Sequence, residues 1–349
     1  MADKKRRFNY RKRLLYQALP LGITFIVFTF GLYYIVGRPS KPVSTGEVLQ
    51  LLSYSSFVNS WGPGEEIVKR FKAETGVQVN LVDGGDGALL LEKMKLIPTD
   101  LVIGLDQFSL VQARQVGKWR SLSEQIPEYN KMPFHEPEFL PFDWGPMTFI
   151  YREGEVLPPE GIEDLLNERY AGSLSLEDPR TSTPGLQFYF WVIDRFGETE
   201  GLEFLKKLKP SLRAVSSSWS SAYGLFTKGE AKLAWSYLTS PVYHWVEEKN
   251  SSYKPSIFKS PMPVQVEYAG IPDSCQNCGA ARLFVQFLVR PDIQKILMEK
   301  NYMFPVVDSV TNGTPFSDLP KIEVYQFRDL QGLLERKDEL LEKWQELGL

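Results

Sequence analysis

Apolar and polar residues alternate along most of this chain in a pattern that predicts strands separated by helices. Strands are predicted at 47–54, 77–83 and 99–106, where the residues are mostly apolar or where apolar and polar residues alternate with period two. Between the first two strands, Pro63 marks the start of a helix and Gly76 its end. Ile67 and Phe71 give this helix an apolar face. Strands separated by short helices are typical of an α/β fold with a doubly wound sheet.

A second α/β unit follows before the chain returns to the first. A long strand at 142–153 leads out of the first unit, and the apolar, extended segment 264–271 leads back. We therefore predict a two-lobed α/β fold with a central cleft. Its first lobe comprises 47–141 and 265–349, and its second lobe comprises 142–264. Ligands of such open sheets bind at the carboxyl ends of the strands.

The segment 322–349 carries a charged, amphipathic helical pattern. The apolar face of such a helix needs a surface to pack against, and its charged face suits solvent. We expect this tail to pack on the first lobe with its outer face solvated.

Residues 14–37 contain no charged side chain, and these 24 residues are enough to span a bilayer as a helix, which needs about 20. Seven basic residues precede this segment within the basic terminus 1–13, which predicts that this terminus is cytoplasmic and that the body lies outside. We interpret the segment as an uncleaved anchor, followed by a short polar linker at 38–46. A cleaved signal peptide is the alternative, although its apolar core is shorter and Gly37 leads into a poor cleavage site.

The charge is distributed unevenly along the chain. The net charge is −3, but residues 1–13 carry seven basic residues against one acid, so the rest of the chain has a net charge of −9. An acidic body argues against nucleic acid as a partner. The contents of 43% hydrophobic and 24% charged residues are ordinary for a folded globular body.

The two cysteines, Cys275 and Cys278, leave three interpretations open: a redox pair, half of a zinc site, or a small disulfide at a helix start. A structural zinc site needs four ligands, and the sequence offers only His135 and His244 in addition and no second CxxC motif. In an oxidising compartment the disulfide is the favoured interpretation.

Polar and aromatic residues gather where predicted strands give way to helices. Ser182 and Thr183 precede a helix start at Pro184, where hydroxyl groups can cap the helix or hold an anion. The other candidates at such ends are Tyr54, Trp61, Asp86, Gly87, Trp219, Tyr237, Ser240, Pro241 and Tyr243. Flat aromatic rings suit a flat heteroaromatic ligand, and their faces attract cations.

No catalytic arrangement is recognisable in the sequence. The two histidines have no obvious Ser or Cys nucleophile nearby, which makes a catalytic triad improbable. There is no phosphate-binding P-loop and no HExxH motif. We therefore expect a binding protein rather than an enzyme, with no cofactor.

A series of motifs occurs in an order that resembles one known family. They are "SYSSFVNSWGPG", "GDGALLL", "DLVIGLD", "PFDWGPMTFIY", "EDPRTSTPGLQF", "SWSSAYGLFTKGEA", "SYLTSPVYH" and "MFPV". Over 47–307 the sequence resembles the thiamine-binding periplasmic proteins, the substrate-binding components of thiamine ABC transporters. The resemblance implies a type II periplasmic binding fold that holds thiamine or its phosphates between the lobes. It also implies an ABC permease with its ATPase as partners, and we expect a monomer whose body lies in the periplasm or outside the cell.

The resemblance also assigns roles to matching positions. It places Asp86 and Gly87 facing the ligand, Ser182 and Thr183 on its phosphate side, and Ser240 with Pro241 at a second helix start. It makes Trp219 and Tyr237 contacting aromatic residues and places Tyr54 and Tyr243 on either side of the ligand. We add to the predicted site Trp61, which lies at a strand end, and Tyr302.

The sequence departs from the family pattern at several positions. Ser55 stands where the family has an acid, Tyr302 stands in place of a Trp, and Trp144 stands in place of a Tyr. A related thiamine precursor is therefore an alternative ligand.

Two further alternatives come from other chemistries. A ferric-ion protein of the same fold would use Tyr237 and Tyr243 as ligands with an anion at Ser182, but these tyrosines are six positions apart rather than adjacent. A tethered thiol oxidoreductase would use Cys275 and Cys278.

Overall fold

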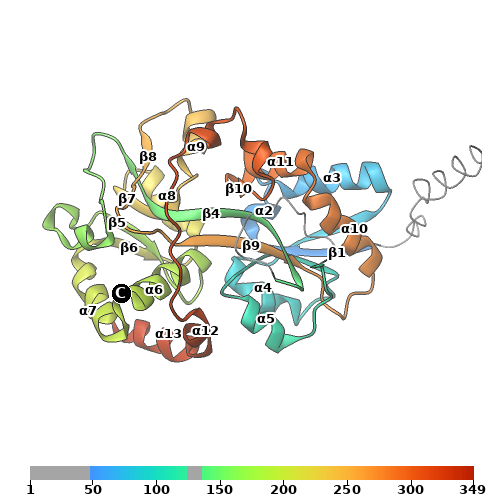
Figure 1. Cartoon of the computed structure of the whole chain (residues 1–349), viewed down its shortest axis with the longest axis horizontal. Helices are drawn as coiled ribbons and strands as arrows, with labels where there is room; N and C mark the ends of the chain where they lie inside the picture. Colours follow the sequence, from blue (N-terminus) through green and yellow to red (C-terminus); the bar gives the residue numbers. More distant parts are fainter. Residues whose placement is uncertain (1–47, 124–135) are drawn as a thin grey trace, which may run out of the picture. The chain divides into compact units, whose positions relative to one another are not determined.

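Two lobes share one continuous sheet in the computed structural model, which describes residues 48–123 and 136–349 (Figure 1). The predicted terminus 1–13, anchor 14–37 and linker 38–46 lie outside the described residues. Within the described part, no helix combines the length and the apolar character needed to cross a membrane. Residues 46–349 form one compact unit.

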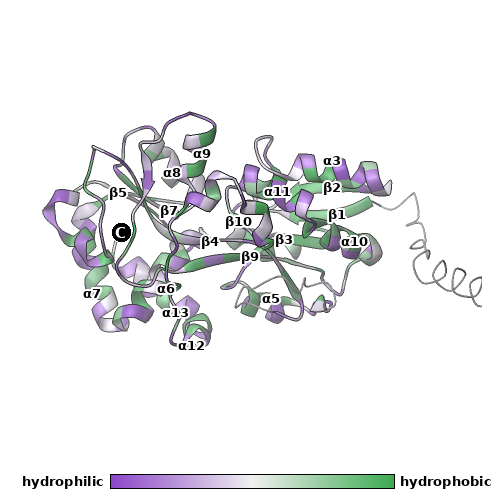
Figure 2. Ribbon diagram, turned by 45° about the horizontal axis from the view of Figure 1, so that its top comes forward, coloured by the Kyte–Doolittle hydropathy of each residue, from purple (hydrophilic) through white to green (hydrophobic). Residues whose placement is uncertain are grey.

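The first lobe is built on parallel strands whose buried residues the alternation predicts. β1 is parallel to β2 and β3, and β9 is antiparallel to both β3 and the first part of β4. β3 is buried at all six positions, and β1 and β9 are among the most hydrophobic elements in Figure 2. The strands are β1 (Val48–Ser53), β2 (Gln78–Asp83), β3 (Leu101–Asp106), β4 (Phe139–Arg152), β9 (Val264–Gly270) and β10 (Phe304–Pro305).

Helices cover this part of the sheet. α3 follows the predicted pattern, with Ile67 and Phe71 buried and Gly76 in the left-handed conformation that ends it. The first group is α2 (Ser55–Val58), α3 (Gly64–Thr75), η1 (Gly87–Leu89), α4 (Leu90–Met94) and α5 (Leu110–Val116). The second group is α10 (Cys278–Leu288), α11 (Pro291–Asn301), η6 (Asp308–Thr311) and η7 (Pro315–Asp318).

The second lobe continues the sheet in the order β4-β7-β5-β6, and β8 also pairs with β4. Its strands are β5 (Leu174–Glu177), β6 (Leu212–Ser216), β7 (Leu233–Tyr237) and β8 (Tyr253–Pro255). Its helices are η3 (Ile162–Leu166), η4 (Glu168–Tyr170), α6 (Thr183–Phe196), α7 (Glu198–Leu208), η5 (Lys209–Ser211), α8 (Trp219–Thr227) and α9 (Pro241–Val246).

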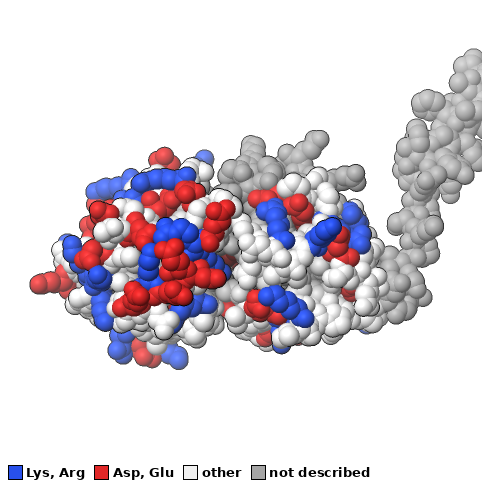
Figure 3. All heavy atoms as spheres, turned by 90° about the horizontal axis from the view of Figure 1, so that it is seen from below, with Lys and Arg blue, Asp and Glu red and all other residues white. Residues whose placement is uncertain are grey.

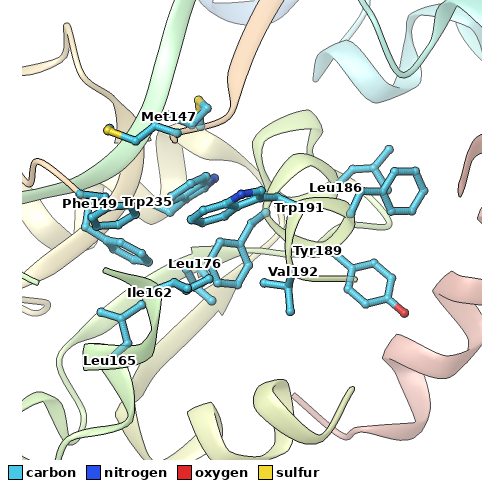
Figure 4. Close-up of a cluster of buried hydrophobic side chains, with 14 of the residues drawn as sticks. Met147, Phe149, Ile162, Leu165, Leu176, Leu186, Tyr189, Trp191, Val192 and Trp235 are labelled. Carbon is cyan, nitrogen blue, oxygen red and sulfur yellow. The ribbon is translucent and has the colours of Figure 1, made fainter. Parts of the chain in front are cut away.

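Aromatic side chains fill the core of the second lobe (Figure 4). Trp191 of α6 stacks on Trp235 of β7, with 5.7 Å between ring centroids. Phe149 of β4 packs against Trp235 at 5.2 Å. Trp235 also donates its indole hydrogen to the Pro184 carbonyl oxygen at 3.0 Å. This core therefore holds the start of α6 against β7, which fixes the turn that the sequence singled out.

The two lobes are joined by a strand that belongs to both. β4 pairs with β9 as far as Pro146 and with β7 from Met147 onward. The passage between lobes thus lies a few residues beyond the boundary expected at 141/142. The predicted two-lobed α/β fold is confirmed, and β9 carries the chain back to the first lobe as its apolar sequence indicated.

The tail was expected on the first lobe, and this expectation is wrong. Helices α12 (Leu330–Glu335) and α13 (Lys337–Glu346) pack on the second lobe beside α6 and α7 (Figure 1). Tyr189 of α6 lies 5.3 Å from Trp344 between ring centroids and donates its hydroxyl hydrogen to the Leu340 carbonyl oxygen at 2.7 Å. An amphipathic pattern predicts that one face of a helix is buried, but it does not predict the surface against which that face packs.

Ion pairs lie around this docked tail. Glu198 at the start of α7 accepts from Arg336 at 2.8 Å and pairs with Lys343 of α13. Figure 3 views the molecule from this side and shows acidic and basic groups intermixed over the lobe. Such exposed pairs contribute little individually, so the buried Leu340 and Trp344 account for most of the attachment.

The extended segment between η7 and α12 leads to the second lobe and pairs with the chain just before β9. Val324 forms a parallel bridge with Met262, and Tyr325 donates its backbone hydrogen to the Met262 carbonyl oxygen at 2.8 Å. The Tyr325 hydroxyl then reaches Asp194 of α6 at 2.7 Å. We refer to residues 322–329 as the strap.

Cys275 and Cys278 form a disulfide bond at the start of α10, as predicted. Asp100, which precedes β3, accepts the backbone hydrogens of Gln276 at 2.7 Å and Asn277 at 2.9 Å. The loop is thereby attached to the first-lobe sheet. This is the arrangement expected of a structural disulfide.

Candidate ligand-binding site

A cleft of about 870 Å³ lies between the lobes and is lined by elements of both. Ten of the twelve predicted site residues line it. They are Tyr54, Trp61, Asp86, Gly87, Thr183, Trp219, Tyr237, Ser240, Tyr243 and Tyr302. The structure therefore brings most of the predicted strand ends together, while their contact with a ligand stays a prediction.

Ser182 and Pro241 do not line the cleft, contrary to expectation. Both are buried, Ser182 completely, and within the described part of the chain the Ser182 hydroxyl has no hydrogen-bond partner. Ser182 is the N-cap residue of α6, and the next two residues, Thr183 and Pro184, reach the cleft instead. The predicted presentation of both hydroxyls to the ligand is thus corrected to Thr183 alone.

Tyr54 is held at the base of the cleft by a buried polar network. Its hydroxyl donates to Glu267 of β9 at 2.6 Å and accepts from the Asn301 side chain at 2.9 Å. Asn301 also donates to Asp143 of β4 at 2.7 Å. Gly104 makes room for this ring, because a Cβ there would lie 2.0 Å from the Tyr54 ring. Gly104 also has φ +101°, which strains any other residue.

Asp143 and Glu267 are opposite each other on β4 and β9, and both are buried. Burial raises the pKa of Glu267 to about 7. Burial, and then the charge of Glu267, raises the pKa of Asp143 well above its usual range. The pair therefore carries at least one proton near neutrality. Sequence reasoning missed it, although an acid inside the apolar run "VQVEYAG" was an available signal.

Asp86 joins the two lobes. It precedes η1 of the first lobe, and its Oδ1 accepts the backbone hydrogen of Thr183, the first residue of α6, at 3.4 Å. Burial raises the pKa of Asp86 to about 6. Glu177, at the end of β5, is buried nearby, and burial raises its pKa well above the usual range. Within the described part of the chain, neither carboxyl oxygen of Glu177 has a hydrogen-bond partner.

An aromatic wall in the second lobe is fixed by a histidine that sequence reasoning did not assign. Trp219 stacks on Tyr223 at 5.2 Å between centroids, and the Tyr223 hydroxyl lies 2.9 Å from His244 Nε2. His244 Nδ1 lies 2.7 Å from Glu248 Oε2. Burial lowers the pKa of His244, so the ring is neutral at pH 7. A neutral ring that donates from Nδ1 to Glu248 accepts from Tyr223 at Nε2, which fixes the orientation of the wall.

The mouth of the cleft is aromatic and acidic. Trp61 is 55% exposed, and Tyr243 meets Tyr302 edge to face at 5.4 Å. The Tyr302 hydroxyl donates to Glu247 at 3.2 Å. The acidic lining residues are Asp86, Glu247, Glu248, Glu267 and Glu299. The basic lining residue is Lys300, whose Nζ lies 3.4 Å from Glu66 Oε2. This electrostatic balance favours a cation.

Ser55, which departs from the family pattern, also lines the cleft. Its hydroxyl donates to Asp83 at 2.7 Å. A carboxylate is therefore present next to the position at which the family has an acid. Among the described residues, no group of three or more His, Cys, Asp or Glu side chains is placed to hold a metal ion. Nothing in the described cleft favours the ferric-ion alternative.

The two lobes and the cleft between them define the class of protein. The family model described as bacterial extracellular solute-binding protein matches residues 98–325. Among solved structures, a periplasmic thiamin-binding protein aligns with a TM-score of 0.80 and 31% identity, covering 86% of this chain and 96% of that one. A ferric binding protein from Campylobacter jejuni aligns with a TM-score of 0.71 and 21% identity, which shows the shared fold alone.

Sequence relatives narrow the class to one family. The thiamine-binding periplasmic protein of Brucella melitensis biotype 1 is 35% identical over 305 residues, which covers 84% of this chain and 90% of that protein. The protein of the same name from Escherichia coli K12 is 34% identical, covering 81% of this chain and 88% of that protein. The chain therefore belongs to the family of the thiamine-binding periplasmic proteins. Its relatives are named as binding proteins, not as enzymes.

Proposed function

We propose that this protein captures thiamine or a thiamine phosphate in the interlobe cleft and delivers it to an ABC permease with its ATPase. The observation that carries the proposal is an aromatic cleft with five acids and one base among its lining residues. Thiamine presents a permanently cationic thiazolium ring and a flat aminopyrimidine ring. Aromatic faces and carboxylates are the groups that recognise such a cation.

Titration of the purified full chain with thiamine, followed by Trp fluorescence, tests the proposal. Trp61 and Trp219 line the cleft, so we expect saturable quenching at micromolar concentrations. Trp219→Phe should reduce the amplitude of the change, whereas Trp119→Phe, in the first-lobe core and away from the lining, should leave both the amplitude and the thiamine dissociation constant unchanged.

The neutral aminopyrimidine half of thiamine, without the thiazolium, is the matched control ligand and should bind at least about tenfold more weakly. No saturable change with thiamine or its phosphates at millimolar concentrations would contradict the proposed function.

We also propose that residues 14–37 anchor the protein in the cytoplasmic membrane with the body outside, where it acts as a monomer. Support comes from the uncharged 24-residue segment and the basic residues before it. The extracytoplasmic body accords with the periplasmic names of the relatives.

A further inference from the structure

One face of α6, a helix of the second lobe, contacts the first lobe. Thr183, Gln187 and Phe190 are spaced four and three positions apart, so they lie on the same face of the helix. The backbone hydrogen of Thr183 points to Asp86 of the first lobe at 3.4 Å. Phe190 meets Phe108, which follows β3, with 5.9 Å between ring centroids. These two contacts flank the position of Gln187 on the helix.

Gln187 itself contacts a strand that connects the lobes. Its side-chain amide donates to the Val264 carbonyl oxygen at 2.5 Å, and Val264 is the first residue of β9. Val264 lies opposite Pro146 of β4, and from the next residue onward β4 pairs with β7 of the second lobe. The hydrogen bond from Gln187 is therefore made where the connecting strands pass from one lobe to the other.

The same carbonyl oxygen also accepts a hydrogen bond from the first lobe. β3 ends at Asp106, and the side chain of the next residue, Gln107, continues its pairing with β9. The Gln107 amide donates to the Val264 carbonyl oxygen at 2.6 Å, and its own oxygen accepts the backbone hydrogen of Val266 at 3.0 Å. One backbone oxygen thus receives a side-chain amide from each lobe.

Packing alone does not account for the amide of Gln187. The side chain is fully buried, and among the residues that the structure describes its oxygen has no hydrogen-bond partner. A buried carbonyl group without a partner is costly, so an apolar side chain of similar size would suit this position better if it only filled space. What the amide contributes is its hydrogen bond to Val264.

We propose, building on the proposed function, that Gln187 is a positioning residue for ligand capture, which holds the two lobes together around the ligand through the Val264 carbonyl group. Both amides reach this oxygen only when α6 of the second lobe and Gln107 of the first lobe approach each other. The same approach brings Thr183 beside Asp86 at the cleft. Gln187 therefore stabilises the lobe arrangement that encloses thiamine, although it does not line the cleft.

Stopped-flow Trp fluorescence of the detergent-solubilised full chain measures the association and dissociation rates of thiamine. Gln187→Met keeps an unbranched side chain of similar length and removes the hydrogen-bond donor. We expect the variant to release thiamine about fivefold faster and to bind it at a rate within about twofold of wild type, because an interaction made in the complex acts mainly on dissociation. An unchanged dissociation rate, beside a wild type that binds thiamine, would overturn the proposal.

Tyr189→Phe, on the same helix, is the matched control. The Tyr189 hydroxyl donates to the Leu340 carbonyl oxygen of the tail, so this variant also loses a buried hydrogen bond of α6, but one that does not face the first lobe. Its thiamine rates should equal those of the wild type, and an equal acceleration in both variants would overturn the specific role of Gln187. Gln187→Asn, which shortens the side chain by one methylene, should also release thiamine faster and replaces Gln187→Met if that variant does not fold.

Spin labels at Lys95→Cys in the first lobe and Lys228→Cys in the second give a measurement that needs no ligand. Both positions are exposed, and the natural cysteines form a disulfide bond and take up no label. In the absence of thiamine, we expect the distribution of label distances to broaden in Gln187→Met and to stay unchanged in Tyr189→Phe.

The distance measurement separates the two levels of the proposal. An unchanged distribution in Gln187→Met would overturn the role of Gln187 and leave thiamine binding intact. A broadened distribution together with a wild type that does not bind thiamine would overturn the proposed function, while the contact of Gln187 would still be shown to hold the lobes.

Discussion

Buried carboxyl groups determine the chemistry of this cleft at the scale of single residues. Glu267 and Asp143 are held side by side by the pairing of β4 with β9. Glu267 accepts hydrogen bonds from Tyr54 and Gln265, and Asp143 accepts one from Asn301, so the donors to this pair are neutral side chains. A carboxyl group that is buried without a cation prefers its neutral form. Ionisation of this pair therefore opposes folding.

Replacement of Glu267 by Gln should stabilise the protein increasingly as pH rises from 5 to 8. In the folded state the pKa of Glu267 is raised to about 7. Its favourable contribution to the free energy of unfolding is therefore fully present below the pKa of the unfolded state and is lost as pH rises through 7. Gln cannot ionise and avoids this loss. The unfolding free energy of the variant minus that of the wild type should therefore increase by about 1–3 kcal/mol between pH 5 and pH 8. Urea unfolding measures the difference, and the exposed Glu299→Gln provides a control that should show no such trend. A difference that stays constant with pH would contradict the prediction.

The sequence allowed us to predict the cleft residues that lie at strand ends, but not those that lie inside strands. Tyr54, Asp86 and Thr183 follow strands, and the carboxyl ends of strands in such sheets meet at a cleft. Glu267 and Asp143 lie within strands, so only the register of β9 on β4 reveals that they face each other. The family resemblance located the region correctly but could not show that Ser182 lies beneath the helix start.

At the scale of elements, the strands of the sheet were visible in the sequence, and the partners of several elements were not. β1, β2 and β3 coincide closely with runs predicted from apolar pattern. β6 is a short edge strand with largely half-exposed residues, so its pattern does not differ from that of a loop. The packing of the tail helices α12 and α13 was also not predictable, because the pattern of their apolar face does not indicate which lobe that face packs against.

Replacement of Trp344 by Ala should destabilise the protein by about 3–5 kcal/mol, the range typical of large-to-small aromatic substitutions in cores. Trp344 is 2% exposed and packs on Tyr189 of the second lobe. Denaturant unfolding measures the loss, and hydrogen exchange should show it concentrated in α6 and α7. Glu342→Ala, at an exposed position of the same helix, should change stability by less than about 0.5 kcal/mol. Exchange accelerated in the first lobe instead would contradict the docking described here.

At the scale of the whole molecule, β4, β9 and the strap connect the two lobes. β4 and β9 form an antiparallel pair at the base of the cleft, and the strap follows the chain just before β9 through Met262. Asp86 and Thr183 meet across the cleft at its other side. Ligand capture in such an arrangement depends on both lobes together, which explains why no single motif predicted the site.

A further prediction for the whole molecule concerns the proposed anchor at residues 14–37. We expect the full chain to sediment with membranes and to resist alkaline extraction, because an uncharged segment of 24 residues is long enough to insert into a bilayer. A version that begins at Gly46 should be recovered in the soluble extracytoplasmic fraction with unchanged thiamine affinity. Phe28→Arg in the full chain should weaken membrane retention, since a central arginine costs about 2.5–3.5 kcal/mol on insertion scales. A mature N-terminus near residue 40 would show cleavage and contradict the anchor.

The docking of the tail on the second lobe has a consequence for the order in which the protein is made. The core of that lobe contains residues from Met147 through Leu333, Leu340 and Trp344, and most of the first lobe is synthesised before or between them. The ribosome releases these last core residues only after nearly all of the chain has been translated. Until then the apolar side chains of α6 that face α13 remain uncovered, so the nascent chain needs protection from aggregation throughout its export.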